Sequence, residues 1–169
     1  MTKHASNSNL FIAYYKSPIG ILEISASNTS IIRLKFCDND SKKSYQLNEI
    51  ISACINQLDQ YFSLSREIFE LPIQPEGSDF QLKVWEELSK IPYGKTITYI
   101  EQSLRIGDPK AIRAVAKANS QNKIPIIIPC HRVIGADGSL VGYGGGLWRK
   151  KWLLEHETKK FGEQISLGL

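Results

Sequence analysis

The sequence predicts an α+β fold, in which a small sheet-and-helix region is followed by a mainly helical region. Short runs of β-branched and aromatic residues fill positions 10–36, and such runs are typical of strands. An apolar pattern with the period of a helix follows at positions 45–62. From residue 78 onward, helix-capping signals recur, and each of them opens a helical pattern.

The chain has room for one domain or two small ones. It has 169 residues, of which 42% are hydrophobic and 22% are charged, which is enough apolar material to bury a core. Prolines and a glycine interrupt every pattern between Pro72 and Gly77. We therefore expect an N-terminal α/β domain at residues 1–77 and a second domain at residues 78–169.

The first region is expected to be a β-meander. Residues 11–15 form its first strand, and Ser17-Pro18-Ile19-Gly20 provides a turn with proline and glycine in suitable places. Residues 21–26 continue the sheet, and a polar turn leads into a strand at residues 31–36. Polar residues 38–44 are expected to form a loop.

A helix is predicted from Tyr45 to Phe62, because its apolar residues recur at the spacing of one buried face. Cys54 lies on that face and is expected to be a core residue, and Cys37, at a strand end, is also given a structural role. A last strand is possible at Ile68–Leu71. The apolar residues of the helix are Leu47, Ile50, Ile51, Cys54, Ile55, Leu58, Tyr61 and Phe62.

Three helices are predicted at the start of the second region. Ser78 and Gln81 form a capping box that opens a helix running to about Ile91, and Thr98 and Glu101 form a second box. The helix after Thr98 ends near Gly107. Asp108 as N-cap and Pro109 as first helical residue then open a helix to about Asn119. Two short helices joined by a glycine-containing turn make a helix-turn-helix candidate.

The stretch Ile124–Ile134 ends in a possible nucleophile. Its apolar run 126–128 suits a buried strand, and Pro129 stops the strand just before Cys130. A thiol there is a nucleophile if a base and positive charge lower its pKa, and otherwise a small buried hydrophobe. From local sequence alone the two interpretations are equal. A glycine-rich loop at 142–146 and an amphipathic helix at Leu147–Glu157 follow, and residues after Thr158 are expected to be a loose tail.

Composition narrows the function classes. Three widely spaced cysteines argue against a disulfide framework and favour the reducing cytoplasm, and no apolar stretch is long enough to span a bilayer. Cysteine and histidine spacing fits no metal motif, so we expect neither metal nor cofactor. Residues 1–77 carry 7 basic against 8 acidic side chains, whereas residues 78–169 carry 14 against 9. This basic second half favours phosphate binding, although a solvated surface with excess lysine remains an alternative.

Pro129-Cys130-His131-Arg132-Val133 resembles the active-site signature of the O6-alkylguanine-DNA alkyltransferases, also called methylated-DNA–protein-cysteine methyltransferases. Further matches span about Ser78 to Glu157 in the same order, including the closing Trp152–Glu157 motif. The resemblance implies direct DNA repair, in which Cys130 takes the alkyl group from O6 of guanine once per molecule and irreversibly. It also implies that residues 78–169 form the DNA-binding and alkyl-transfer domain. O4-alkylthymine stays open as a second substrate.

The resemblance also implies a role for each site residue. Cys130 is the acceptor, His131 its base, and Glu157 orients the imidazole, while Asn122 supports the active-site turn. Tyr99 hydrogen-bonds the flipped base, and Arg113 fills the stack where the guanine was. His156 is expected at the surface. The alkylguanine pocket is expected to be walled by Val133, Ile134, Tyr143, Gly144, Gly145 and Gly146, with Gly144 standing where some members carry serine.

The implied partner is double-stranded DNA that contains alkylated guanine. The helix that carries Arg113 would dock in the minor groove, largely independently of sequence, and its alanines would let it approach closely. We expect Thr98, Ala114, Lys117 and Arg132 to take part in DNA binding as well. No membrane partner is expected; the protein would be a monomer in solution, and cooperative assembly on DNA stays open.

Two other functions remain as alternatives. A non-enzymatic binder of alkylated DNA would use the same helix-turn-helix, but relatives of that kind lack the cysteine. A hydrolase with a Cys-His-Glu site would use the same three residues, but the basic helix-turn-helix argues against it.

Overall fold

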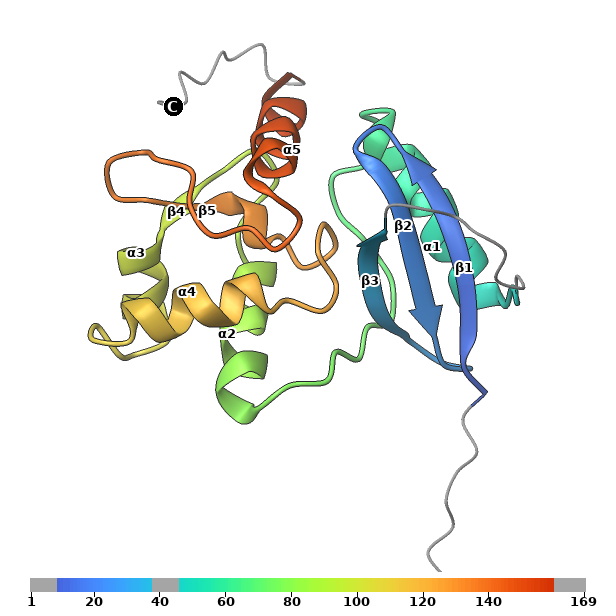
Figure 1. The fold of residues 1–169 in the computed structure, drawn as a ribbon, viewed down its shortest axis with the longest axis horizontal. Helices are drawn as coiled ribbons and strands as arrows, with labels where there is room; N and C mark the ends of the chain where they lie inside the picture. The colour runs from blue at the N-terminus through green and yellow to red at the C-terminus, as the bar shows by residue number, and fades with distance from the viewer. Residues whose placement is uncertain (1–8, 38–45, 160–169) are drawn as a thin grey trace, which may run out of the picture.

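The computed structural model describes residues 9–37 and 46–159, and it has the predicted α+β architecture (Figure 1). A three-stranded sheet with one helix forms the first half, and a group of helices forms the second. The predicted loop at 38–44 and most of the predicted tail lie outside the described residues. No helix in the described part combines the length and apolar character that crossing a membrane requires.

The sheet is a meander of β1 (Phe11–Ser17), β2 (Gly20–Ala26) and β3 (Ile31–Cys37), as predicted. Both pairs are antiparallel, and the first is closed by the turn before Gly20, whose φ of 118° suits glycine. Figure 1 shows α1 covering one face of this sheet, while β3 is the strand nearest the helical half.

Helix α1 (Glu49–Phe62) begins later than the sequence pattern suggested, so the predicted start at Tyr45 was wrong. Asn48 is the N-cap: its side chain accepts a hydrogen bond from the backbone N–H of Ile51 at 2.9 Å and donates one to the carbonyl of Ser27. This cap fixes the first turn against the sheet. The buried residues of the helix are Ile51, Cys54, Leu58 and Tyr61, all on the predicted face, whereas Leu47 was wrongly placed there, because it lies before the helix and is exposed.

The possible strand at Ile68–Leu71 was wrong. In the described chain only a single bridge forms in this region, two residues later, where Ile73 lies beside Ile31 in parallel. Ile31 donates its N–H to the carbonyl of Pro72 and accepts from the N–H of Gln74. Pro72 itself has no N–H, so the segment cannot extend the ladder as a regular strand.

Both predicted capping boxes are confirmed. Ser78 and Gln81 cap α2 (Asp79–Ser89), and Thr98 and Glu101 cap α3 (Tyr99–Arg105). Helix α4 (Ile112–Ser120) instead begins after Ala111, later than the predicted start at Asp108. Asp108 uses its side chain and its carbonyl to close a turn with the N–H groups of Lys110 and Ala111, which delays the helix.

The pair α3 and α4 is held in a fixed geometry by buried polar groups. Gln102 on α3 and Asn119 on α4 exchange two amide hydrogen bonds, of 3.2 and 2.7 Å, and are almost completely buried. The indole N–H of Trp85 on α2 donates to the carbonyl of Ala118 at 2.9 Å. These bonds fix the carboxyl end of α4, from which the chain turns toward Cys130.

The chain before Cys130 is not the predicted strand. Ile126 has a φ of 75°, and the N–H of Ile128 donates to the carbonyl of Ile124 at 2.9 Å, so this run folds back on itself. Ile126 and Ile128 are buried as expected and Ile127 is partly buried, but the run forms a compact loop. Two short strands, β4 (Ile97–Thr98) and β5 (Val133–Ile134), pair in parallel. Helix α5 (Leu147–Lys159) is the last element of the described chain.

Candidate active site

Asn122 organises the turn that presents Cys130. Its side-chain carbonyl accepts from the N–H of Ile124 at 2.9 Å, and its amide donates to the carbonyl of Ile128 at 2.7 Å. One side chain thereby spans the loop and stabilises the unfavourable backbone of Ile126. The same amide lies 3.2 Å from Cys130 Sγ and donates to it. The side-chain amide of Asn122 therefore determines both the shape of the loop and the surroundings of the Cys130 thiol.

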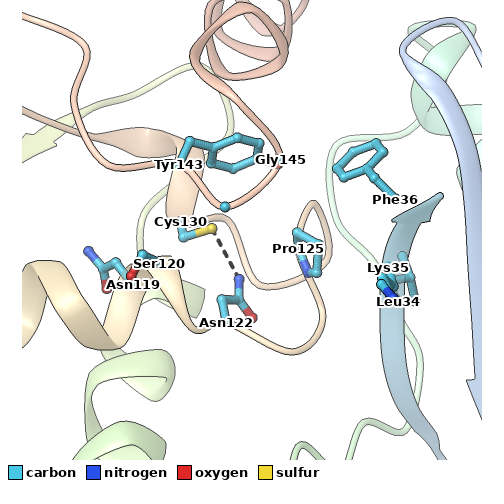
Figure 2. A pocket seen from close by; sticks show the side chains of 11 residues that line it. Leu34, Lys35, Phe36, Asn119, Ser120, Asn122, Pro125, Cys130, Tyr143 and Gly145 are labelled. Carbon is cyan, nitrogen blue, oxygen red and sulfur yellow. Dashed lines mark hydrogen bonds between the residues drawn. The ribbon is translucent and has the colours of Figure 1, made fainter. Parts of the chain in front are cut away.

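Cys130 begins the 3-10 helix η1 (Cys130–Arg132) and is only 5% exposed. The sulfur nevertheless has open space beside it, because Cys130 lines a cavity of about 210 Å³ between the two halves of the chain (Figure 2). The thiol is therefore sheltered without being walled off. The cavity is lined by Leu34, Lys35, Phe36, Asn119, Ser120, Asn122, Pro125, Cys130, Tyr143, Gly144 and Gly145.

Burial raises the pKa of the Cys130 thiol, because the thiolate is poorly solvated there. The Asn122 hydrogen bond and the positive charge of Lys150 oppose this rise. The resting group is consequently a neutral thiol at pH 7, and it needs a base to react.

Glu157 on α5 accepts hydrogen bonds from four residues, which come from three parts of the chain. Its Oε1 accepts from the Tyr61 hydroxyl at 2.9 Å and lies 2.8 Å from His131 Nε2. Arg132 donates through Nε to Oε2 and through Nη2 to Oε1, each at 2.9 Å, and the N–H of Gly94 donates to Oε2 at 3.0 Å. Burial alone would raise the pKa of Glu157, but His131 and Arg132 outweigh it and hold this pKa well below its usual range. Glu157 is therefore a carboxylate.

The charge of Glu157 fixes the tautomer of His131. A carboxylate can only accept hydrogen bonds, so His131 Nε2 carries the proton and donates. Its Nδ1 is then a bare acceptor, and it has no hydrogen-bond partner among the described residues. Burial lowers the pKa of His131, although Glu157 opposes this, so the ring is neutral at rest. A neutral imidazole with a free Nδ1 is what a general base requires.

Lys150 is a second buried cation at the site, and the sequence interpretation missed it. It is fully buried, donates to the carbonyl of Val141 at 2.7 Å, and lies 3.4 Å from the Tyr99 hydroxyl. Burial lowers the pKa of Lys150 to about 8. A signal was present: Lys150 shares the helical spacing of Leu153, Leu154 and Glu157, which places it on the buried face.

The expected pocket residues divide into two groups. Tyr143, Gly144 and Gly145 line the cavity with Cys130, whereas Tyr99, Val133 and Ile134 do not. Tyr99 is buried, its hydroxyl donates to the carbonyl of Val141 at 2.9 Å, and burial raises its pKa to about 12. At Gly144 an added Cβ would lie 2.9 Å from the carbonyl oxygen of Ser120, so glycine fits this backbone and serine would crowd it.

The expected DNA-binding residues also divide. Arg113, Ala114 and Lys117 are exposed on α4, so their side chains are available to a partner. The hydroxyl of Thr98 accepts from the N–H of Glu101 as the cap of α3. Arg132 was expected to bind DNA, but it is 7% exposed, and its guanidinium bonds Glu157 and the carbonyl of Ile91. That expectation was wrong, because the guanidinium of Arg132 is paired with the buried carboxylate of Glu157.

His156 was expected at the surface and is buried instead, so that prediction was wrong. Its Nε2 lies 2.8 Å from the carbonyl oxygen of Tyr61, and its ring stacks on Trp152 at 4.7 Å. Tyr61 itself was assigned only to the core, although its hydroxyl reaches Glu157. The spacing within α1 indicated burial, but nothing in the sequence indicates a partner 96 positions away.

Known proteins resemble both halves of the chain. Residues 10–75 match the family model described as 6-O-methylguanine DNA methyltransferase, ribonuclease-like domain, and residues 79–159 match the model of its DNA binding domain. The methylated-DNA–protein-cysteine methyltransferase of Methanosarcina barkeri is 44% identical over 149 residues, covering 84% of this chain and 93% of the relative. That of Mycobacterium leprae is 43% identical over 155 residues, covering 89% and 94%.

Solved structures agree with the sequence relatives. The crystal structure of Mycobacterium tuberculosis O6-methylguanine methyltransferase superimposes with a TM-score of 0.81 at 38% identity, covering 89% of this chain and 94% of that one. The OGT of the same organism in complex with DNA gives a TM-score of 0.79 at 41% identity, covering 87% and 92%. With both family models matched and relatives above 40% identity over most of their length, this chain belongs to the 6-O-methylguanine DNA methyltransferase family.

Proposed function

We propose that the protein repairs alkylated DNA directly, by moving the alkyl group from O6 of guanine to its own Cys130. The observation that carries this proposal is the sheltered thiol of Cys130, which lines a cavity and neighbours the polarised pair His131–Glu157. Membership of the methyltransferase family supplies the reaction class. The chain is thus a methylated-DNA–protein-cysteine S-methyltransferase.

The reaction starts with removal of the thiol proton. No direct hydrogen bond joins Cys130 Sγ to His131 among the described residues, so one water molecule would carry the proton to Nδ1. The imidazolium that forms is stabilised by the carboxylate of Glu157 at 2.8 Å. Asn122 and Lys150 stabilise the thiolate, since both oppose the effect of burial on its pKa.

Alkyl transfer is an in-line displacement. The thiolate attacks the alkyl carbon, an S–C bond forms, the C–O6 bond breaks, and its electron pair stays on the guanine. The Tyr99 hydroxyl would hydrogen-bond the leaving base, and Lys150, 3.4 Å from that hydroxyl with a pKa of about 8, would supply the proton. The product is a thioether, which no group of this site can cleave, so each molecule reacts once and irreversibly.

Damaged duplex DNA is the proposed partner. The exposed side of α4, with Arg113, Ala114 and Lys117, supplies cations beside a small residue and suits the minor groove, which is about 6 Å wide. Arg113 would occupy the stack from which the guanine has been extruded. Thr98 acts mainly as a helix cap, and we assign phosphate binding to Lys117 in preference to Arg132.

We divide the chain at residues 77 and 78, with an α/β unit before this point and the reacting unit after it. The separate matches of residues 10–75 and 79–159 support this division. We also propose a cytoplasmic location. All three cysteines are free thiols, which fits a reducing compartment.

The proposal is tested by intact mass spectrometry after incubation with duplex DNA that contains O6-methylguanine. One methyl group per protein molecule is expected, located on Cys130, and none in Cys130→Ser. Cys37→Ser and Cys54→Ser serve as matched controls that keep the uptake. Repeated turnover would indicate a hydrolase, and tight DNA binding without a mass change would indicate a damage sensor; either result overturns the proposal.

Extrusion by Arg113 has a separate test. Arg113→Ala should slow methyl uptake from duplex DNA far more than uptake from the free alkylated base, because only the duplex requires base flipping. Equal slowing with both substrates would contradict the role.

A further inference from the structure

Three donors share one oxygen atom of Glu157. The Tyr61 hydroxyl lies 2.9 Å from Oε1, His131 Nε2 lies 2.8 Å from it, and Arg132 Nη2 lies 2.9 Å from it. A carboxylate oxygen that already accepts other hydrogen bonds has less negative charge to offer a further donor. The bond from Tyr61 therefore affects how strongly Glu157 can stabilise a positive charge on His131.

The hydroxyl of Tyr61 comes from the half of the chain that carries none of the proposed catalytic groups. Tyr61 lies near the end of α1 and is fully buried. Its main-chain carbonyl oxygen lies 2.8 Å from Nε2 of His156 on α5, and its ring packs on Phe62 and Phe69 with centroid distances of 5.2 and 5.4 Å. Both the backbone and the ring are held, so the hydroxyl has a fixed direction toward Glu157.

This hydroxyl is a permanent and uncharged donor. Burial, and then the charge of Glu157, raise the pKa of Tyr61 well above its usual range, so the group keeps its proton. A carboxylate has no proton to give, so the bond runs from Tyr61 to Oε1. Because the donor is neutral, Tyr61→Phe removes one hydrogen bond from Glu157 and changes no charge.

The other groups around His131 and Glu157 act through charge. Arg132 is paired with Glu157, and Lys150 acts on His131 as a neighbouring cation. The charge of Glu157 also reaches His156 and Tyr93. The side chains that face the pair are thus Tyr61 from α1, Tyr93 from the segment before β4, Arg132 from η1, and Lys150 and His156 from α5.

We propose that Tyr61 is a positioning residue for the general base, and that its bond to Oε1 limits the negative charge that Glu157 offers to His131. The inference rests on the proposed function, in which His131 takes the proton of Cys130. It gives the first half of the chain a part in the chemistry, since a hydroxyl on α1 then controls the basicity of an imidazole in η1.

The direction of the effect follows from the electrostatics. Burial lowers the pKa of His131, and Glu157 opposes this. A donor that takes up part of the carboxylate charge weakens that opposition, so Tyr61 acts in the same direction as burial and keeps the resting imidazole neutral. Only the neutral ring can accept a proton. Without the hydroxyl, His131 should hold a proton to higher pH.

The first test is the NMR resonance of the Nε2–H proton of His131, recorded at pH 8 on protein without DNA. A stronger hydrogen bond to Oε1 moves this resonance downfield. It should therefore move downfield in Tyr61→Phe. Tyr15→Phe is the matched control, because it removes a 2.8 Å bond from a tyrosine hydroxyl to Asp59 on the same helix, away from Glu157, and should leave the resonance in place.

A donor stronger than tyrosine reverses the sign. The hydroxyl of 3-fluorotyrosine is more acidic, so this residue at position 61 should draw more charge from Oε1 and move the His131 resonance upfield. Opposite movements in the two variants support the sharing of charge. Movement in the same direction in both, or none in Tyr61→Phe, overturns the inference, because the variants then report general loosening or no coupling.

The second test is the rate of methyl uptake from duplex DNA containing O6-methylguanine. As pH is lowered from 8 to 5.5, the rate of Tyr61→Phe relative to the unaltered protein should fall by up to about 10-fold, the effect of moving a titration by one pH unit. Equal slowing at every pH would show a purely structural role and overturn the inference. If the unaltered protein takes up no methyl group, the proposed function fails, whereas the NMR comparison still decides whether Tyr61 and His131 share the carboxylate.

Discussion

Cys130 lies between two unlike regions. On one side is the carboxylate of Glu157, which accepts hydrogen bonds from Tyr61, Gly94, His131 and Arg132 in a fully buried setting. On the other side is the cavity at 143–145, where glycine backbone, aromatic rings and open space meet. The first region holds charge in fixed positions, whereas the lining of the second is mostly uncharged, with Lys35 as its one charged side chain among the described residues.

The contrast separates two tasks. Preparing a buried thiol requires donors and charges that do not move, and a nearly complete set of hydrogen bonds provides that. The proposed entry of a nucleobase and its alkyl group requires volume, which the cavity of about 210 Å³ beside Cys130 provides. Mutations in the first region should therefore cost stability together with reactivity, and mutations in the second should alter selectivity or fit.

The largest effect is expected at Glu157. Glu157→Gln removes the negative charge and leaves Arg132 as an unpaired buried cation, so the free energy of unfolding should fall by about 3–5 kcal/mol. Urea denaturation measures this, with Glu155→Gln as the control, since Glu155 is exposed on the same helix. A loss below about 1 kcal/mol, the range of surface ion pairs, would contradict the network.

The same residue predicts a pH dependence of stability. The pKa of Glu157 is depressed in the folded protein, so its contribution is complete above the ordinary carboxyl pKa of 4.5 and is lost as pH falls below that value. The unfolding free energy of the unaltered protein should therefore decrease more steeply from pH 5 to pH 2 than that of Glu157→Gln. If the unfolding free energies of the two proteins decrease in parallel, the acid sensitivity comes from other carboxyl groups.

Lys150 should affect rate more than stability. Lys150→Met removes a charge that favours the thiolate and a proton donor for the leaving base, so transfer should slow by about 10²-fold. Stability should change little or rise, because methionine needs no buried partner. Lys151→Met is the neighbouring control. Similar slowing in both variants would indicate a surface charge effect instead.

The pKa of Lys150 also shapes the pH profile of the rate. Deprotonation of Cys130, whose pKa is raised, makes the rate increase with pH, whereas Lys150 loses its charge above about pH 8. The increase should therefore flatten above pH 8 in the unaltered protein and should not flatten in Lys150→Met. A profile of the same shape in both proteins would exclude this role.

A smaller effect is expected at Gly144. Gly144→Ser places a Cβ 2.9 Å from the Ser120 carbonyl oxygen, so the cavity segment must shift, at a cost of about 1–3 kcal/mol. Thermal unfolding measures the loss, with Ala136→Ser in an exposed position as the control. Unchanged stability would mean that the segment moves freely.

The smallest effect is expected on α4, outside both regions. Lys117→Ala should weaken duplex binding and lower the slope of log affinity against log salt by about 1, because one phosphate contact is lost. Lys83→Ala on α2 is the control. Identical slopes for the two variants would remove Lys117 from the interface.

Local signals in the sequence were enough for much of the fold. The capping boxes at Ser78 and Thr98 placed two helix starts correctly, and the period of residues 50–61 identified the buried face of α1. The resemblance of the segment around Cys130 also indicated Asn122 and Glu157, which the structure brings to the thiol and to His131 respectively.

Other features depended on contacts that the sequence does not display. The apolar run at 126–128 looks like a strand, but the side chain of Asn122 bonds the backbone at both ends of the loop and folds it back. From the sequence alone, Arg132 looks like a phosphate ligand. In the structure its charge is paired with Glu157, which lies 25 positions later in the chain. The place of Phe36 in the cavity wall gave no signal in the sequence, because the end of β3 meets the 143–145 segment only in the folded chain.

The hydroxyl of Tyr61 has a consequence for the timing of maturation. Tyr61 belongs to α1, yet it completes the hydrogen bonding of a carboxylate near the other end of the chain. A nascent polypeptide therefore cannot assemble the complete Glu157 hydrogen-bond network until α5 has been synthesised and has docked on α1. For a protein that can use its sulfur only once, this order keeps the thiol unreactive until the whole molecule is ready for DNA.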